Sequence, residues 1–392
     1  MTIEHRRARP ALRTSLAITW LTTLVLVPAY AAPAYQLSTI SSTLGAPVMN
    51  ATGTLAGISQ DHLAIFQDGI TTLVDQPANT NFSWATAIND QGLVLGGAAR
   101  NTLVGGSVEQ AGHMVTDKQQ QFLYQNGKLT NLQQIIGLPF VSQTPGPSAL
   151  VTGLNNSGDL VGAISQTGSP SKAAFVYRNG QVQTIATPGN WTSASASAIN
   201  NLGVVVGSYE TAKPGTSEFE SGIFVEDHGK LTDLGGPEGG MSRVRGFNDK
   251  GQILIENTSG NWIYENGQFT ALNTPSQSPD TFFSAKGLGE DGVVIGFGAS
   301  NTWSAVPILY AHGQRYDPNA LIDAQSAAQH HITDLLSINS KGDILALDQA
   351  GQQVLLSPLS AVPETGALKL MASGLGLMAL LRRARRIKAA EQ

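Results

Sequence analysis

One short phrase recurs seven times along the chain and constrains the fold more than any other feature. It consists of an apolar residue, Asn, two variable residues, Gly and a β-branched run, and residues 198–207 (AINNLGVVVG) are its clearest copy. Asn favours the opening of a type I turn and Gly adopts the left-handed conformation that closes it, so each copy predicts a tight β-hairpin. The copies are anchored at Gly53, Gly92, Gly158, Gly203, Gly251, Gly292 and Gly342.

A second hairpin follows each copy, as in residues 174–185 (AFVYRNGQVQTI), where an aromatic run meets Asn-Gly and then an alternating run. Each unit therefore supplies four short antiparallel strands. The units repeat at roughly 40 to 65 residues, which is typical of propeller blades. They are not uniform, because Gly289 replaces the Asn of the sixth copy, and Ile255 and Ala346 replace the last Gly of the fifth and seventh.

The two ends of the repeat array predict a closed ring. The seventh unit ends near Pro358 without a fourth strand, and an unassigned strand, residues 35–40, precedes the first unit. Pairing these two elements leaves no long exposed edge. We therefore predict an all-β, seven-bladed β-propeller closed by its N-terminal strand. A six-bladed ring with a partly irregular first unit is the alternative.

The N-terminus has the features of a secretory signal peptide. Four arginines, an apolar stretch over residues 16–27 and Ala29-Tyr30-Ala31 predict a helical signal peptide over 1–31, cleaved after Ala31. A membrane anchor is the alternative. The propeller is expected over residues 32–360, and the absence of cysteine excludes disulfides and thiolate metal sites.

The C-terminus, residues 361–392, combines three features of a sorting segment. Val362-Pro363-Glu364 precedes a mostly apolar stretch, within which Leu370 to Leu381 form a short predicted helix. Basic residues follow it: Arg382, Arg383, Arg385 and Arg386. The positive-inside rule places such a cluster on the cytoplasmic side, and the helix is too short for a comfortable permanent span. We therefore expect transient anchoring in the inner membrane before cleavage.

This terminus resembles that of the PEP-CTERM proteins, and the repeats resemble the extracellular HAF repeat with its Ala-x-x-Ile-Asn-x-x-Gly-x-Val-x-Gly core. The chain departs from the PEP-CTERM pattern at Thr365, where the family has a second proline, and at Lys369 within the apolar stretch. The resemblance implies export in a Gram-negative bacterium, processing by an exosortase-type enzyme and delivery to the cell surface or extracellular matrix. An uncleaved C-terminal anchor is the alternative.

Charge and motifs argue against several functions. Ten of the 23 Lys and Arg lie in residues 1–31 and 364–392 but only three of the 28 Asp and Glu, so the remainder carries a net charge of about −12 and is not expected to bind nucleic acid. The sequence lacks nucleophile-elbow and nucleotide-binding motifs. The repeated asparagines are expected to form turns, and neither they nor His330-His331 have metal-site spacing. We predict no cofactor, no metal and no catalytic residue.

Recognition is expected on the face where the loops vary in length, because variable loops on a rigid scaffold commonly bind ligands. Trp84, Trp191 and Trp303 are predicted there, with Phe283 nearby, and could stack on sugar rings; the alternative is that each tryptophan fills a gap between blades. The leading hypothesis is a secreted, non-enzymatic surface or matrix protein with an interaction or structural role, for which exopolysaccharide is the candidate ligand. A propeller-based carbohydrate-active enzyme and a scaffold for an envelope protein are the alternatives.

Overall fold

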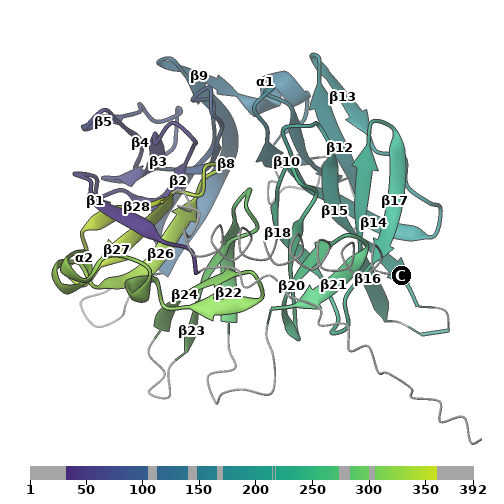
Figure 1. Ribbon diagram of the computed structural model, residues 1–392. Helices are drawn as coiled ribbons and strands as arrows, with labels where there is room; N and C mark the ends of the chain where they lie inside the picture. Colours follow the sequence, from purple (N-terminus) through teal and green to yellow (C-terminus); the bar gives the residue numbers. More distant parts are fainter. Residues whose placement is uncertain are drawn as a thin grey trace, which may run out of the picture. The chain divides into compact units, whose positions relative to one another are not determined.

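The computed structural model describes residues 32–104, 113–139, 148–165, 171–213, 215–216, 218–272, 283–299 and 305–359. These residues form seven four-stranded antiparallel sheets, which are the blades of a β-propeller (Figure 1). The prediction of seven blades is confirmed, and the six-bladed alternative is wrong.

Six blades follow the chain in the simple order of a meander. Blades one and two comprise β2 (Gly45–Met49), β3 (Leu55–Ser59), β4 (His62–Gln67) and β5 (Ile70–Leu73), then β6 (Phe82–Ile88), β7 (Val94–Val104), β8 (His113–Gln125) and β9 (Lys128–Asn131). Blades three and four comprise β10 (Ser148–Leu154), β11 (Leu160–Ser165), β12 (Lys172–Arg178) and β13 (Gln181–Thr184), then β14 (Trp191–Ile199), β15 (Val205–Ala212), β16 (Phe219–Asp227) and β17 (Lys230–Gly235). Blades five and six comprise β18 (Arg243–Phe247), β19 (Ile253–Asn257), β20 (Gly260–Glu265) and β21 (Gln268–Ala271), then β22 (Phe283–Leu288), β23 (Val294–Ala299), β24 (Ala305–Ala311) and β25 (Gln314–Tyr316).

The seventh blade joins the two ends of the described chain. It contains β26 (Ile332–Ile338), β27 (Ile344–Asp348) and β28 (Gln353–Pro358), and its fourth strand is β1 (Tyr35–Thr39). The purple β1 lies alongside β28 in Figure 1, with Leu37 opposite Leu356. The first strand of each blade contacts the first strand of the next, including β26 with β2. The predicted closure by the N-terminal strand is therefore confirmed.

The turns have the conformations that the repeat predicts. Gly203 closes its hairpin with a φ of 79°, and Asn179 and Gly180 both have positive φ in the following hairpin. The peptide N–H of Gly203 donates to the carbonyl of Asn200 at 3.0 Å. The local sequence therefore determines the hairpins directly.

The apolar core of the described residues is divided among the junctions between blades. Seven clusters of buried side chains can be distinguished, and each spans two neighbouring blades. At the junction of blades three and four, for example, Val161 and Ala174 pack with Ala196 and Phe224. Burial between blades, rather than within one shared centre, is thus the main apolar contribution to stability.

The connection before the seventh blade contains η1 (Pro318–Ala320) and α2 (Ala324–Gln329). Asp323 caps the first turn of α2, and His330 ends that helix rather than lying on a strand. The Nδ1 atom of His330 lies 2.9 Å from a carboxylate oxygen of Asp348, whereas Asp334 pairs with Lys286. Within the described residues, no group of three or more His, Asp or Glu side chains could hold a metal ion.

Asp348 gives the closing blade a predicted dependence on pH. Burial raises the pKa of its carboxyl, but hydrogen bonds from His330, Gln352 and Ala350 outweigh that effect and lower the pKa below the ordinary value of 3.8. A carboxyl whose pKa is lower in the folded than in the unfolded state stabilises the fold. This contribution is fully present when the pH is above the unfolded-state pKa, and it is lost as the pH falls through the folded-state pKa. We expect the melting temperature of the wild type to fall more steeply below about pH 4 than that of Asp348→Asn.

The measurement is a series of thermal melts from pH 6 to pH 3. Asp68→Asn is the control, because Asp68 is exposed in a turn where other blades carry Asn. Parallel curves for the wild type and Asp348→Asn would contradict the expected contribution of Asp348.

No helix among the described residues has the length and apolar character needed to cross a membrane.

Candidate functional site

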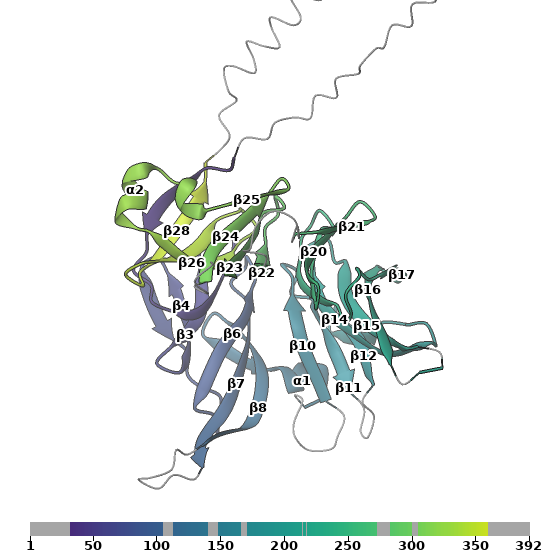
Figure 2. The same ribbon diagram turned by 90° about the horizontal axis from the view of Figure 1, so that it is seen from below.

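The two ends of each blade have different loops. The Asn-Gly turns follow the first strand, and the second hairpin turns at the same end; we call this end the turn face. The connections between the second and third strands, and between successive blades, lie at the other end, which we call the loop face. On the loop face, β7 and β8 form an arm longer than the other hairpins, with 11 and 13 residues (Figure 2).

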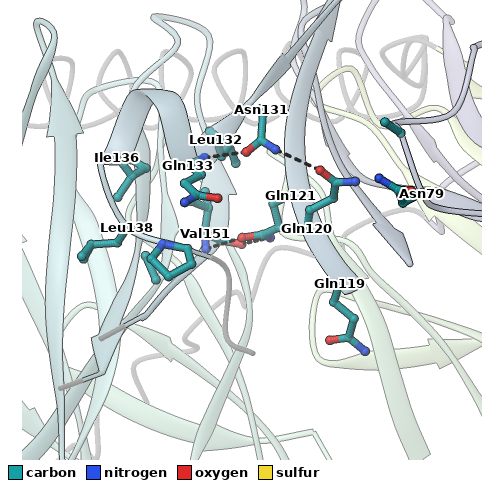
Figure 3. A pocket seen from close by; sticks show the side chains of 13 residues that line it. Asn79, Gln119, Gln120, Gln121, Asn131, Leu132, Gln133, Ile136, Leu138 and Val151 are labelled. Carbon is teal, nitrogen blue, oxygen red and sulfur yellow. Dashed lines mark hydrogen bonds between the residues drawn. The ribbon is translucent and has the colours of Figure 1, made fainter. Parts of the chain in front are cut away.

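A pocket of about 340 Å³ lies at the base of this arm, between blades two and three. We call it the amide pocket, because six of its thirteen lining residues are Asn or Gln and none is charged (Figure 3). The lining residues are Ala78, Asn79, Gln119, Gln120, Gln121, Asn131, Leu132, Gln133, Ile136, Leu138, Pro139, Ala149 and Val151.

A short helix, α1 (Leu132–Ile136), forms one wall of the pocket. The Asn131 side chain accepts a hydrogen bond from the Gln133 N–H at 2.8 Å and so caps the helix, and Gly137 ends it with a φ of 79°. Leu132 and Ile136 are buried in the cluster that joins blades two and three. This burial fixes the helix between the blades and leaves Gln133 exposed at the pocket.

Gln121 holds the opposite wall in place. Its amide donates to the carbonyl of Val151 and accepts from the N–H of Val151, both at 2.8 Å, and only 7% of the residue is exposed. Gln121 on β8 therefore joins its blade to β10 through both its NH₂ group and its side-chain oxygen. Its role is to position the pocket.

The neighbouring amides keep hydrogen-bonding capacity. Asn131 donates to the side-chain oxygen of Gln120 at 2.9 Å, which orients Gln120 and leaves its NH₂ group without an acceptor among the described residues (Figure 3). The side chains of Asn79, Gln119 and Gln133 likewise have no hydrogen-bond partner within the described part of the chain. Each free amide offers a donor and an acceptor side by side.

This combination favours a neutral ligand rich in hydroxyl groups. Neighbouring hydroxyls of a sugar can each donate and accept, which matches paired amide groups, and Ile136, Leu138 and Pro139 supply apolar surface for a ring face. The volume is at the lower end of the range of small-molecule sites. The described lining contains no carboxylate, histidine or hydroxyl group that could act as acid, base or nucleophile.

The predicted tryptophans do not line the amide pocket. Trp84, on β6, lies against Gly97, with the ring of Phe82 at 5.8 Å from its own. Trp191 stacks on Tyr209 with ring centres 3.8 Å apart and packs on the cluster between blades three and four. Both stand at the loop-face end of a first strand, as expected, and both have structural contacts; their binding of sugar stays a prediction.

The remaining residues predicted from the sequence are either buried or outside the described part of the chain. Phe283 begins β22 and so stands at the loop-face end of a first strand, as expected, but it is 2% exposed and belongs to the core between blades five and six. Trp303 and the sorting-signal residues from Val362 to Arg386 lie outside the described residues.

The repeated asparagines form turns, as predicted, but they have a second role. Asn200 accepts from the N–H groups of Leu202 and Val204, and its amide donates to the carbonyl of Asn248 in the next blade at 3.2 Å. The donation to the following blade recurs at Asn50, Asn89, Asn155, Asn248 and Asn339. Only the step from blade six to blade seven lacks it, because Gly289 has no side chain.

A similar contact recurs on the third strands. Gln121, Asn261 and Gln353 occupy the same place in blades two, five and seven, and each donates to a carbonyl on, or just before, the first strand of the next blade. The repeat pattern did not reveal these contacts, because the other blades have Leu, Ala, Ile or Pro there. The only available signal was an amide within an otherwise apolar run.

Comparisons with known proteins show the fold alone. No family model matches the chain, and no curated protein matches it. Among solved structures, the β-propeller domain of the Trilobed protease from Pyrococcus furiosus is 9% identical, with a TM-score of 0.46, over 84% of this chain and 99% of that one. TolB from Acinetobacter baumannii is 10% identical, with a TM-score of 0.39, over 83% and 79%. The gluconolactonase XC5397 from Xanthomonas campestris is 14% identical, with a TM-score of 0.32, over 55% and 70%. Such distant similarity carries no information on ligand or activity.

Proposed function

We propose that this protein is a non-enzymatic binding propeller that holds a neutral extracellular polysaccharide in the amide pocket. The observation that carries the proposal is the uncharged lining, in which amides with free hydrogen-bonding groups stand beside apolar side chains. A site of this kind binds hydroxyls without performing acid or base chemistry on them.

The ends of the chain extend this proposal to a location. A signal peptide over 1–31 would export the protein, and the segment after Val362 would hold it transiently in the inner membrane until an exosortase-type enzyme cleaves it. The mature propeller would then reside at the cell surface or in the matrix, where polysaccharide is the abundant polymer. The mass of the native mature chain tests both cleavages.

Affinity electrophoresis of residues 32–360 tests the binding. Each gel contains one polymer: a neutral glucan, a neutral galactomannan, acidic alginate or the exopolysaccharide of the source bacterium. We expect a neutral polymer to retard the wild type. The double variant Gln120→Ala/Gln133→Ala should bind that polymer about tenfold or more weakly, because each lost hydrogen bond to a ligand weakens binding by about 1 kcal/mol. Gln268→Ala, an exposed amide on blade five, is the matched control.

Three results would contradict the proposal. Equal retardation of the double variant and the wild type would place binding elsewhere, including at the tryptophans. Retardation by alginate alone would exclude a neutral ligand. Release of new reducing ends would show the carbohydrate-active enzyme that we consider the alternative.

A further inference from the structure

A second pocket, between blades three and four, has a different chemistry from the amide pocket. Its volume is about 420 Å³. It opens near the turn between β16 and β17, and its walls come from β12, β13, β16 and β17. We call it the carboxylate pocket, after Glu226.

Glu226 is a buried carboxylate with unused hydrogen-bonding capacity. Its residue is 8% exposed, and one oxygen, Oε1, accepts from the N–H of Gly229. The other oxygen, Oε2, is shielded from solvent and has no hydrogen-bond partner among the described residues. A carboxylate has about four acceptor positions, so most of those on Glu226 are vacant. A buried carboxylate without a compensating partner lowers the free energy of unfolding, and a bound cation would offset this cost.

The two basic side chains that line the pocket, Arg178 and His228, have other partners. The guanidinium of Arg178 lies 3.1 Å from Asp159 and donates to the carbonyl of Gly203 at 2.7 Å. His228 lies 2.7 Å from the carboxylate of Asp227. Within the described residues, Glu226 forms no ion pair, so its negative charge is the one that a ligand can neutralise.

The rest of the lining suits an alkyl group. Val176 and Ile185 are buried, and Leu231 is the cross-strand partner of Glu226, so its side chain lies on the same face of the sheet. An ammonium at Glu226 would extend its carbon chain along these three side chains. With only one carboxylate in the lining, the pocket lacks the several oxygen ligands that Ca²⁺ or Mg²⁺ requires.

We propose that the carboxylate pocket binds a primary alkylammonium group, with Glu226 as its counter-ion. The group can belong to a free amine or to the lysine side chain of a protein. This site is separate from the amide pocket, and it would remain if the amide pocket proved not to bind polysaccharide.

Calorimetric titration of residues 32–360 with n-butylammonium tests the proposal. We expect binding that n-butanol, the uncharged analogue of similar shape, does not show, and a loss of at least about tenfold in affinity in Glu226→Gln, which removes the charge but keeps the shape. Titration with N-acetyl-lysine methylamide distinguishes the two sources: tighter binding than n-butylammonium indicates a protein lysine, and weaker binding indicates a free amine.

A second variant keeps the test decisive if Glu226→Gln folds poorly. Leu231→Lys would place an ammonium beside Glu226 from the opposite strand, so it should block the pocket and abolish titration by n-butylammonium. Gln181→Lys, on the exposed part of β13, is the matched control for added charge. Failure of n-butylammonium to bind the wild type, undiminished binding in Glu226→Gln, or binding of Ca²⁺ in place of the amine would overturn the proposal.

Discussion

Replacing Asn200 by Ala lowers the free energy of unfolding by about 2–4 kcal/mol, since one buried and two partly buried backbone groups lose their partners together. The Asn200 side chain accepts hydrogen bonds from the N–H groups of Leu202 and Val204 and donates one to the carbonyl of Asn248. Ala can do neither. We expect the melting temperature to fall by about 5 °C or more, as measured by calorimetry or by circular dichroism at the β-sheet band.

Asn200→Asp separates the two roles of this side chain. Asp keeps the oxygen that forms the turn but loses the amide that bridges the blades. The chain contains a natural precedent, because Asp348 accepts from the N–H groups of Ala350 and Gln352 at 2.9 and 2.8 Å in the same kind of turn. We expect Asn200→Asp to lose part of the stability that Asn200→Ala loses. Identical stability of Asn200→Asp and the wild type would show that the bridge between blades contributes nothing.

The sixth blade shows how the ring tolerates a missing asparagine. At Gly289 the turn acceptor is replaced by Asp291, whose carboxylate accepts from the N–H of Val293 at 3.1 Å. The bridge to blade seven is replaced by the ion pair of Lys286 with Asp334 and by a large apolar cluster that includes Ile295, Leu309 and Leu335. At Asn200 the neighbouring Asn201 also binds Asp249 of the next blade, but that bridge is exposed and does not satisfy the buried carbonyl of Asn248.

Replacing Gly162 by Ala lowers stability by about 3 kcal/mol or more, at the upper end of the cost of overpacking a core. A Cβ atom at Gly162 would lie 1.9 Å from the carbonyl oxygen of Leu150 and 2.9 Å from the ring of Phe175. The first contact is with backbone, which cannot rotate away as a side chain can. The strands of blade three must therefore separate to admit one methyl group.

Thermal melts of Gly162→Ala and Gly189→Ala check this prediction. Gly189 is the matched control, because no atom lies within 4 Å of an added Cβ and its φ is not in the left-handed region. Blades five and seven accept Ile255 and Ala346 at the corresponding place, with Trp262 and Val354 opposite in the third strand. If Gly162→Ala melts with the wild type, blade three is more adaptable than its close contacts indicate.

The fold could be predicted because its determinants are local. Asn and Gly at fixed spacing specify each turn, the turns specify hairpins, and the strand missing from the seventh unit matches the extra strand at the start. The pairing of the N-terminal strand with the seventh unit could therefore be predicted from the number of strands at the two ends of the array. The bridges made by Gln121 and by the amide of Asn200 could not be predicted, since each depends on how far one blade lies from the next.

The candidate site could be predicted only in its location. Variable connections pointed to the loop face, and the amide pocket lies there, but the sequence emphasised tryptophans. Trp191 proved to pack on Tyr209 within a core cluster. The amides that line the pocket come from β8, α1 and the connection before β6, so only the folded chain brings Asn79, Gln120 and Gln133 together.

The most direct test of the proposed function is to observe the side-chain amides themselves as a ligand binds. Residues 32–360 labelled with ¹⁵N at Gln and Asn are titrated with oligosaccharides from whichever neutral polymer retards the protein, or from the native exopolysaccharide. The account predicts shifts of the NH₂ signals of Gln120, Gln133 and Asn79, while those of the buried bridges at Asn200 and Asn155 stay in place. Unchanged pocket signals at saturating oligosaccharide, or shifts confined to other amides, would contradict it.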